Sequence, residues 1–500
     1  MKTSLISAFL LFFTLFTLKE LPVAAKERQS AERPNILFIA IDDLRNDLGI
    51  LDVEHAHTPH LDAFAAQSRL FSRHYVQVPS CGPSRAALLS GQWPGSQARI
   101  NNNAILNTYG DWQTPSLPVW LREQGYLTLS LGKISHYPGG LTGENWNAPP
   151  EEMPGAWDKA WIPDSPWEHA LSIMHGYANG VPRTPGVSSP IEAYDGPDEA
   201  YPDAWVAKDA IEVLHRLASN GSEPPSTRIA LPASQPGQPW FFAVGFFKPH
   251  LPFAAPRTWF DLHDADAIAV PADTTRPPAP SHWHGSGEMF GNYGHPEGAR
   301  TDPEWHKQLR HAYAASTSYV DEQVGRVLRT VEELGLTENT IIVIWSDHGF
   351  ALGEQAIWGK HSLYEVALKA PLFISYPGMP EPGPISDATV ESIDIYPTIV
   401  DLAGLTAPDA LHGYSLRPML EDPQAPSLKP AYGFWNNGLV SVRDDRFRLI
   451  VRRNESGTFT HTELYGFGNS AHGVRLHTEA WQPEIEQLLR HLEQLPGKPH

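Results

Sequence analysis

The chain has 500 residues, of which 41% are hydrophobic, so it can bury a sizeable core and lacks the composition of a disordered protein. Its formal net charge of −20 argues against nucleic acid as a partner, because phosphate contacts need a basic face. Any site for an anionic substrate must therefore be a local cluster of Lys, Arg and His side chains.

The first 25 residues are typical of a signal peptide. Lys2 precedes an apolar stretch over residues 5–18, and residues 23–25 supply the small side chains that a cleavage site needs. The stretch is shorter than the about 20 residues of a membrane span, and no later segment is long and apolar enough for one. We therefore expect an exported chain, periplasmic or extracellular, with no membrane span after cleavage.

Five short apolar runs predict buried strands, at residues 35–41, 126–131, 240–246, 340–346 and 371–376. Helical patterns lie between them, at about 203–217 and from the predicted N-cap Asp302, followed by Pro303, to a stop signal at Gly335. Strands that alternate with helices predict an α/β fold with a largely parallel sheet. In such sheets, ligands gather beyond the carboxyl ends of the strands.

The character of the sequence changes towards its C-terminus. Residues 439–453 predict a hairpin with its turn at 444–445, and residues 481–495 predict a closing helix. We therefore expect a large N-terminal domain over residues 33–410. A small α+β subdomain, an antiparallel sheet plus a helix, is expected over residues 411–500.

Cys81 is the only cysteine, so an exported chain forms no internal disulfide and this thiol needs its own explanation. Pro83 suits the first turn of a helix that ends near Gly91, which places the thiol at a helix N-terminus, where anions are favoured. Arg85 adds a fixed positive charge. These residues alone leave open the alternative of an ordinary buried cysteine.

Acidic pairs follow two of the predicted strands. Asp42 and Asp43 end the first strand, and Asp347 with His348 ends the fourth. Hard cations such as Ca²⁺ take several oxygen ligands, mostly carboxylates, and carboxylates at two strand ends can meet above one sheet. Taken alone, Asp42 and Asp43 also fit a turn that terminates a strand.

Basic side chains also follow the predicted strands, namely Lys133, His136, Lys248, His250 and Lys360. Each of them alone is more often a surface lysine or a histidine whose ring is satisfied by local hydrogen bonds. Together, at one edge of a sheet, they can surround an anion such as sulfate.

Cys-Gly-Pro-Ser-Arg at residues 81–85, followed by Leu-Ser-Gly at 89–91, resembles the signature of the type I, formylglycine-dependent sulfatases. Gly-Lys-x-x-His at 132–136, Lys-Pro-His-x-Pro-Phe at 248–253 and the stretch 346–360 are similar to the iduronate-2-sulfatase branch and its bacterial polysaccharide-sulfatase relatives. The resemblance runs over about residues 33–405. The tail departs from it, because Glu-Leu-Tyr at 463–465 is followed by Gly-Phe-Gly and not by an acidic stretch.

The resemblance implies an alkaline-phosphatase-like fold, with a large mixed and mostly parallel sheet flanked by helices, and makes residues 33–410 the catalytic sulfatase domain. It also implies that a formylglycine-generating or sulfatase-maturating enzyme converts Cys81, and that the hydrated aldehyde, a gem-diol, is the nucleophile. One Ca²⁺ per chain is expected, held by residue 81 together with Asp42, Asp43, Asp347 and His348.

The remaining roles are expectations built on the same resemblance. Arg85, Lys133 and Lys360 should face the negative charge that develops on the sulfate, and Asp347 should accept the nucleophile's proton. His250 is the expected acid for the leaving alcohol, with Lys248 or Lys360 as the next candidate, and His136 is the expected base for sulfate release. Trp358 and His361, with the Trp-rich segment over residues 145–167, are the candidates to line a sugar pocket, and packing is the alternative for the tryptophans.

The expected reaction is hydrolysis of an O-sulfate ester, 2-O-uronate-like, on a sulfated glycan or oligosaccharide. A phosphonate or phosphodiester hydrolase of the same superfamily is one alternative, and the Lys-Pro-His string counts against it. A glycan-binding homologue without turnover is the other, and it would require the loss of a catalytic residue.

Overall fold

The computed structural model describes residues 33–142, 150–219, 229–454, 456–468 and 473–495. The predicted signal peptide lies outside these ranges. The described residues from 34 onwards pack as one compact unit, and the predicted boundary at residue 410 stays a prediction. Within the described ranges, no helix combines the length and the apolar composition that crossing a bilayer requires.

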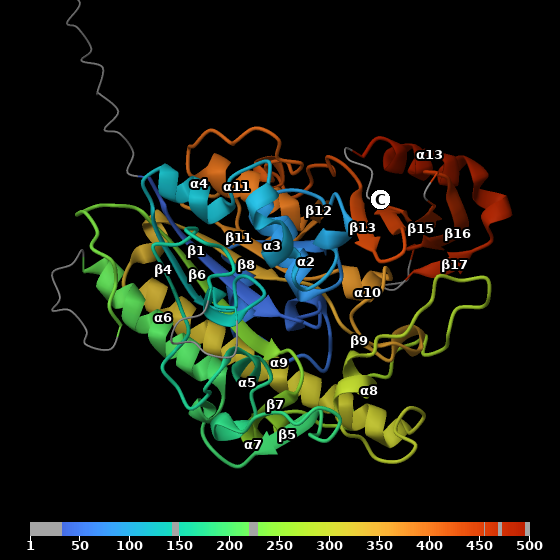
Figure 1. Cartoon of the computed structure of the whole chain (residues 1–500), viewed down its shortest axis with the longest axis horizontal. Helices are drawn as coiled ribbons and strands as arrows, with labels where there is room; N and C mark the ends of the chain where they lie inside the picture. The colour runs from blue at the N-terminus through green and yellow to red at the C-terminus, as the bar shows by residue number, and fades with distance from the viewer. Residues whose placement is uncertain (1–32, 143–149, 220–228, 455, 469–472, 496–500) are drawn as a thin grey trace, which may run out of the picture. The chain divides into compact units, whose positions relative to one another are not determined.

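An eight-stranded mixed sheet forms the centre of this unit (Figure 1). Its strands lie in the order β12 (Ser386–Glu391), β2 (Arg69–Tyr75), β11 (Leu372–Ser375), β8 (Thr340–Ser346), β1 (Asn35–Asp42), β6 (Trp240–Pro249), β3 (Leu127–Gly132) and β4 (Lys159–Trp161). Only β11 runs antiparallel to its neighbours. All five strands predicted from the sequence are present, and the mostly parallel sheet confirms the predicted fold class.

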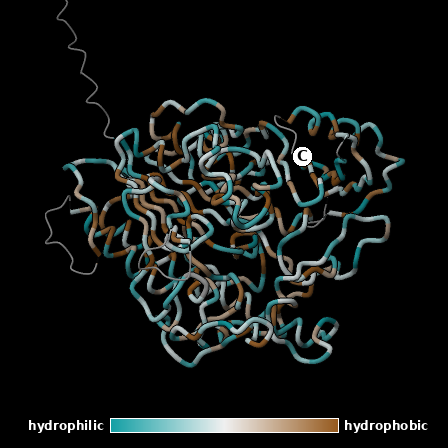
Figure 2. Tube along the Cα trace, viewed as in Figure 1, coloured by the Kyte–Doolittle hydropathy of each residue, from teal (hydrophilic) through white to brown (hydrophobic). Residues whose placement is uncertain are grey.

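Helices cover both faces of the sheet, because side chains of the buried strands alternate between two apolar layers. In β1, Leu37 packs in one layer and Phe38 in the other. Figure 2 shows the apolar residues concentrated along these strands. The helices are α6 (Pro202–Ala218) and α9 (Pro303–Glu333) on one face, and α2 (Cys81–Ser90), α4 (Leu117–Glu123) and α11 (Ile395–Leu402) on the other.

The helix ends follow the predicted local signals. Asp302 caps α9, accepting a hydrogen bond from the backbone N–H of Glu304 at 3.0 Å, and Gly335 follows the helix with φ of 66°. Gly91 ends α2 in the left-handed region, with φ of 64°. Both helices therefore begin and end close to where the sequence places them.

The C-terminal part is a five-stranded antiparallel sheet with one long helix. The predicted hairpin is β14–β15, and its turn is held by Asp444 Oδ1, which accepts from the backbone N–H groups of Arg446 and Phe447 at 2.9 and 2.7 Å. This confirms the predicted C-terminal architecture. The elements are β13 (Ala431–Trp435), β14 (Leu439–Arg443), β15 (Phe447–Arg453), β16 (Phe459–Gly466), β17 (Val474–Leu476) and α13 (Gln482–Glu493).

Short elements complete the described part of the fold. The helices are α1 (Pro59–Ala65), α3 (Ala104–Thr108), α5 (Ala170–Met174), α7 (Arg257–Phe260), α8 (Glu288–Asn292), α10 (Glu365–Leu368) and α12 (Arg417–Glu421). Two small sheets pair β5 (Ile191–Tyr194) with β7 (Phe253–Pro256), and β9 (Ala351–Leu352) with β10 (Trp358–Gly359).

The sequence pattern missed β2, whose seven residues include three basic ones. Arg69 is buried because its guanidinium donates to backbone carbonyls, including that of Leu420 at 3.0 Å. His74 is buried between the carbonyl of Ala370 at 2.9 Å and Ser392 Oγ at 2.8 Å. Partners about 300 residues away along the chain make these polar residues compatible with a buried strand.

The parallel register brings the carboxyl ends of four strands together. Ile41 in β1 pairs with Phe246 in β6 and with Ser346 in β8, and Gly132 in β3 pairs with Gly245 in β6. The chain then leaves the sheet at one common edge. The residues at or just beyond these ends are Asp42, Asp43, Lys133, Lys248, His250, Asp347 and His348.

Candidate active site

Cys81 is the first residue of α2, and Asn102 fixes this end of the helix. The Oδ1 atom of Asn102 accepts hydrogen bonds from Ser80 Oγ at 2.8 Å and from the backbone N–H of Gly82 at 3.2 Å. A Cβ on Gly82 would stand 2.3 Å from the carbonyl oxygen of Asn102, so only glycine allows this approach. The helix start is therefore held rigidly where the thiol projects.

The thiol of Cys81 lies among charged groups from three other parts of the chain. Sγ is 3.2 Å from Lys360 Nζ, 3.3 Å from His348 Nε2 and 3.8 Å from Asp43 Oδ1. The residue is 1% exposed, and burial raises the pKa of the thiol well above its usual value. An ordinary buried cysteine would have apolar neighbours. The three groups nearest to this thiol are instead a lysine, a histidine and an aspartate.

Asp42 is held by two cations. Lys133 Nζ lies 2.5 Å from Asp42 Oδ2, and Arg85 Nη2 lies 3.0 Å from Asp42 Oδ1. Burial by itself raises the pKa of a carboxyl group, but these two charges outweigh it and hold the pKa of Asp42 well below its usual value. Lys133 reaches this point because β3 approaches β6 closely, and a Cβ on Gly245 would stand 2.1 Å from the carbonyl oxygen of Lys133.

Asp43 and Asp347 meet beside the thiol. The backbone N–H of Asp43 donates to Asp347 Oδ1 at 3.0 Å, and Lys360 Nζ lies 2.9 Å from Asp43 Oδ1. His348 Nε2 is 3.2 Å from the same oxygen of Asp43. Burial raises the pKa of both carboxyl groups, and the negative charge of Asp42 adds to the effect. The three carboxylates are therefore crowded in a way that an additional cation would relieve.

Arg85 is bound to the carboxylates of the cluster. Its Nε donates to Asp347 at 2.9 Å, and its remaining nitrogens are engaged by Asp42 and by the carbonyls of Lys133 and Ile134. The guanidinium therefore positions two carboxylates, and its expected role towards the sulfate stays a prediction. Lys133 and Lys360 are likewise paired with carboxylates, Asp42 and Asp43.

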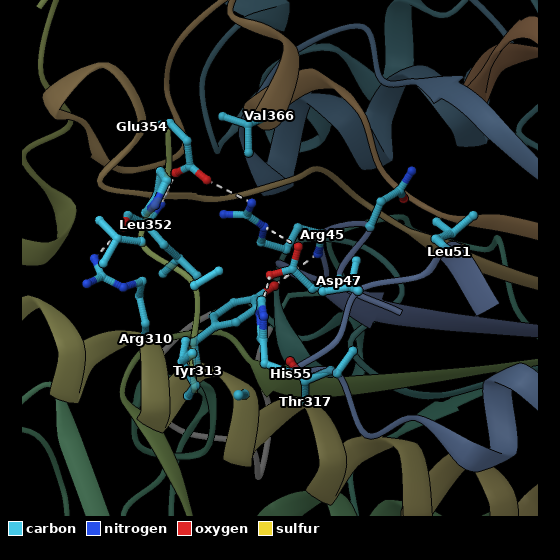
Figure 3. Close-up of a pocket in the computed structure, with 18 of the residues that line it drawn as sticks. Arg45, Asp47, Leu51, His55, Arg310, Tyr313, Thr317, Leu352, Glu354 and Val366 are labelled. Atoms are coloured by element: carbon cyan, nitrogen blue, oxygen red, sulfur yellow. Dashed lines mark hydrogen bonds and ion pairs between the residues drawn. The ribbon is translucent and has the colours of Figure 1, made fainter. Parts of the chain in front are cut away.

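A supporting network holds the turn after β1 from its outer side. Tyr313 in α9 donates its hydroxyl to the carbonyl of Asp43 at 2.8 Å and accepts from the backbone N–H of Arg45 at 2.9 Å. Arg45 pairs with Asp47 at 2.9 Å and Glu354 at 2.8 Å. Figure 3 shows these groups along a cavity of about 470 Å³ that lies beside the turn. Asp43, with φ of 62°, is kept in a left-handed conformation by these bonds.

The two expected acid–base histidines differ in their surroundings. His250 is buried, and its Nδ1 lies 2.7 Å from the carbonyl of Leu251, which leaves Nε2 for the cluster. His136 is partly buried, and its Nδ1 has no hydrogen-bond partner among the described residues. Burial, with the charges of Lys360 for His250 and Lys133 for His136, lowers the pKa of both rings well below their usual value.

Lys248 is not presented to the cluster. Its Nζ donates to the carbonyls of Pro252 at 2.6 Å and His250 at 3.3 Å. Burial lowers the pKa of Lys248 to about 8. This lysine therefore holds the turn that carries His250, and its expected role as a substitute acid stays a prediction.

The two residues expected to bind sugar have different environments. Trp358 is 6% exposed and packs against Phe290, against the ring of His306 at 4.7 Å and under Arg310, which favours the packing alternative, and its role in sugar binding stays a prediction. His361 is partly buried beside Lys360, and its ring stacks on Trp435 at 5.3 Å. Because His361 is only partly buried and lies next to Lys360, its role in sugar binding stays a prediction.

Sequence reasoning missed Glu288, the first residue of α8. Its Oε1 lies 3.0 Å from Lys360 Nζ and 3.7 Å from His250 Nε2. No motif marks this residue, because it lies in a glycine-, serine- and histidine-rich stretch outside the predicted elements. Only the fold brings it to the cluster.

The donor set fits a hard divalent cation. Ligand atoms of Asp42, Cys81, Asp347 and His348 all lie within 4.8 Å of one another, and Asp43 joins the cluster through its bond to Asp347. Three carboxylates with a single imidazole favour Ca²⁺ over softer metals such as zinc. Burial, with the negative charge of Asp42, raises the pKa of Asp43 and Asp347, and a bound cation would lower both.

Known proteins are similar to this chain over most of its length. The family model described as Sulfatase matches residues 34–405, and that of the N-sulphoglucosamine sulphohydrolase C-terminal region matches residues 353–494. A sulfatase from Formosa agariphila is 31% identical over 449 residues, covering 86% of this chain and 81% of that protein. Iduronate 2-sulfatase from Mus musculus is 29% identical over 420 residues, covering 77% and 71%.

Among solved structures, the phosphonate monoester hydrolase of Agrobacterium radiobacter has a TM-score of 0.70 at 22% identity, covering 92% of this chain and 96% of that one. This likeness supports the alkaline-phosphatase-like fold. The family match covers well over half of the chain and includes the residues of the buried cluster described above. The chain therefore belongs to the formylglycine-type sulfatase family, and it is a sulfuric ester hydrolase.

Proposed function

We propose that this enzyme hydrolyses an O-sulfate ester on a sulfated glycan, with residue 81 as formylglycine and one Ca²⁺ in the acidic cluster. A 2-O-sulfated uronate is the first substrate to test, because the motifs at residues 132–136 and 248–253 are similar to those of iduronate-2-sulfatases. The proposal includes export of the chain and its maturation by a formylglycine-generating or sulfatase-maturating enzyme.

One observation carries the proposal. Residue 81 stands at a helix N-terminus with its reactive atom 3.2 Å from Lys360 Nζ and beside the carboxylate cluster. A nucleophile, a cationic surface and a metal-ligating set therefore share one buried point. Sulfate ester hydrolysis needs these three things at the reacting sulfur.

The proposed chemistry needs two groups that translation does not supply, a Ca²⁺ ion and the formylglycine at residue 81. Ca²⁺, held by Asp42, Asp43, Asp347 and His348, would supply Lewis-acid stabilisation of negative charge. Formylglycine would supply two hydroxyl groups on one carbon, one for attack on sulfur and the second for the release of sulfate.

The side chains of the cluster divide the remaining work. Lys133 and Lys360 neutralise charge on the sulfate oxygens, and Arg85 orients the carboxylates of Asp42 and Asp347. His250 presents Nε2 and is proposed to protonate the leaving sugar oxygen. His136 is proposed to assist sulfate release as a base.

The proposal is tested with protein that carries formylglycine, verified by mass spectrometry of the peptide around residue 81. We expect sulfate release from a panel of sulfated oligosaccharides and from an aryl sulfate, with much slower hydrolysis of an aryl phosphonate ester. Faster turnover of the phosphonate would instead assign the activity of the phosphonate hydrolases that share the fold. No turnover of any sulfate ester by converted protein would refute the proposal.

A further inference from the structure

The segment over residues 281–288, named here the rim segment, runs beside the buried cluster and was not predicted from the sequence. It connects the cluster to the C-terminal sheet, and it ends at Glu288. Three of its side chains form hydrogen bonds that hold it. The ring of His282 bonds to the carbonyl of His461, the ring of His284 bonds to the carbonyl of His361, and Ser286 Oγ lies 3.0 Å from Nδ1 of His361. The position of Glu288 is therefore set by a fixed segment.

Glu288 lies between Lys360, which is proposed to contact the sulfate, and His250, which is proposed to protonate the leaving sugar oxygen. Oε1 is 3.0 Å from Lys360 Nζ, and Lys360 in turn is 3.2 Å from the Cys81 sulfur. The same oxygen is 3.7 Å from Nε2 of His250, the proposed acid for the sugar oxygen. Glu288 therefore lies between the lysine that is proposed to contact the sulfate and the histidine that is proposed to protonate the sugar oxygen.

A carboxylate in this place opposes the binding of a negatively charged substrate. Two unit charges of like sign a few ångströms apart repel, and burial strengthens the effect. The Glu288 side chain is 13% exposed, and its second oxygen, Oε2, is buried without a hydrogen-bond partner among the described residues. Buried carboxylate oxygens normally accept a hydrogen bond. The described part of the chain supplies no donor for Oε2.

We infer that Glu288 is a specificity residue that accepts a hydrogen bond from a hydroxyl or ammonium group on the sugar carbon next to the sulfate ester. This inference rests on the proposed function. Such a donor would pair with Oε2 while Oε1 stays with Lys360. The substrate class is then a sugar sulfate with a free donor beside the ester, such as a 2-O-sulfated uronate with its 3-hydroxyl unsubstituted. Substitution or removal of that hydroxyl leaves the buried oxygen unpaired, which costs binding.

The test crosses an enzyme variant with a substrate variant. The methyl glycoside of a 2-O-sulfated iduronate is compared with its 3-deoxy analogue, using formylglycine-bearing wild type and Glu288→Gln. Wild type should prefer the hydroxyl substrate by about tenfold or more in kcat/KM, since a hydrogen bond to a charged group is lost with the deoxy analogue. Glu288→Gln should lose most of this preference. An unchanged preference in the variant would overturn the inference.

Inhibition by inorganic sulfate, measured with an aryl sulfate as substrate, gives a second readout that does not depend on the sugar. Removal of the negative charge beside Lys360 should tighten sulfate inhibition by about threefold or more. Weaker or unchanged inhibition would show that Glu288 only clamps Lys360, and would also overturn the inference. The control is Glu297→Gln, which removes the same charge from an exposed position nine residues further along. If wild type releases no sulfate from any ester, the proposed function fails first.

Discussion

Two buried charge clusters in this enzyme, the candidate active site and an ion pair around Glu365, differ in how their charges are arranged. In the cluster at the sheet edge, three carboxylates are crowded together, and burial raises the pKa of Asp43 and Asp347. In the second cluster, Glu365 stands alone against Arg448 at 2.8 Å, Arg443 at 3.5 Å and the hydroxyl of Tyr75 at 2.6 Å.

The second cluster is fully compensated within the protein. Burial by itself raises the pKa of Glu365, but the two arginines outweigh it and bring that pKa to about 2. In the first cluster each carboxylate also has a cationic partner, but only the pKa of Asp42 is lowered, whereas burial and neighbouring carboxylates leave the pKa of Asp43 and Asp347 raised. Burial is common to both clusters, so like-charge crowding, and not burial, marks the functional one.

The largest expected effect separates chemistry from folding at Cys81. Cys81→Ala should lower turnover of an aryl sulfate by about 10⁴-fold or more, because the nucleophile is gone. The melting temperature should shift by only a few degrees, since no disulfide is lost and one buried atom is removed. Substantial activity in a preparation shown by mass spectrometry to lack formylglycine would contradict the mechanism.

Removal of a metal carboxylate should be the next largest effect. Asp42→Ala should reduce kcat/KM by about 10³-fold, because it removes a Ca²⁺ ligand and the partner of Lys133 and Arg85. Exhaustive chelation of wild type should reproduce most of this loss, and added Ca²⁺ should restore it. Elemental analysis that found tightly held zinc, or activity untouched by both changes, would contradict the assigned metal.

The proposed division of labour between the histidines predicts a smaller, substrate-dependent effect. His250→Ala should lower the rate on a sugar sulfate by about 10²–10⁴-fold, since a sugar alkoxide needs protonation as it leaves. An aryl sulfate leaves as a stabilised phenolate and should be affected far less. His136→Ala should slow both substrates and let sulfated enzyme accumulate. Equal losses on both substrates for His250→Ala would remove it from the acid role.

The structural cluster should respond in stability and not in chemistry. Glu365→Gln should destabilise the protein by about 3–5 kcal/mol in urea unfolding at neutral pH, because it leaves two buried arginines without their carboxylate. The folded fraction should retain turnover per molecule close to that of wild type. A large loss of turnover with unchanged stability would show that the two clusters are not separate.

The sign of the pH dependence follows from the lowered pKa of Glu365. Its unfolded pKa is about 4.3, so the stabilisation is fully present above that pH and is lost as pH falls towards 2, where the folded state takes up the proton. The free energy of unfolding of wild type should therefore fall towards that of Glu365→Gln between about pH 4.3 and pH 2. Urea unfolding midpoints of the two proteins, measured across this range, should approach each other as the pH falls. A difference that stays constant would contradict the prediction.

Local patterns in the sequence were sufficient for the five strands, the two long helices and the C-terminal hairpin. Apolar runs, the cap at Asp302 and the stop at Gly335 act over a few residues, so they are visible without the fold. The motif around Cys81 and the charged residues after the strands also lie within short stretches, and the parallel register brought them together as expected.

Only the tertiary structure decided which of these side chains face the reacting centre. Lys360 reaches Cys81 whereas Lys248 turns back to the carbonyl of Pro252, although both follow predicted strands. Trp358 is buried in the core, and Glu288 reaches Lys360 from a segment with no motif. These outcomes depend on side-chain directions and on packing between segments far apart in the chain, and no pattern of neighbouring residues contains that information.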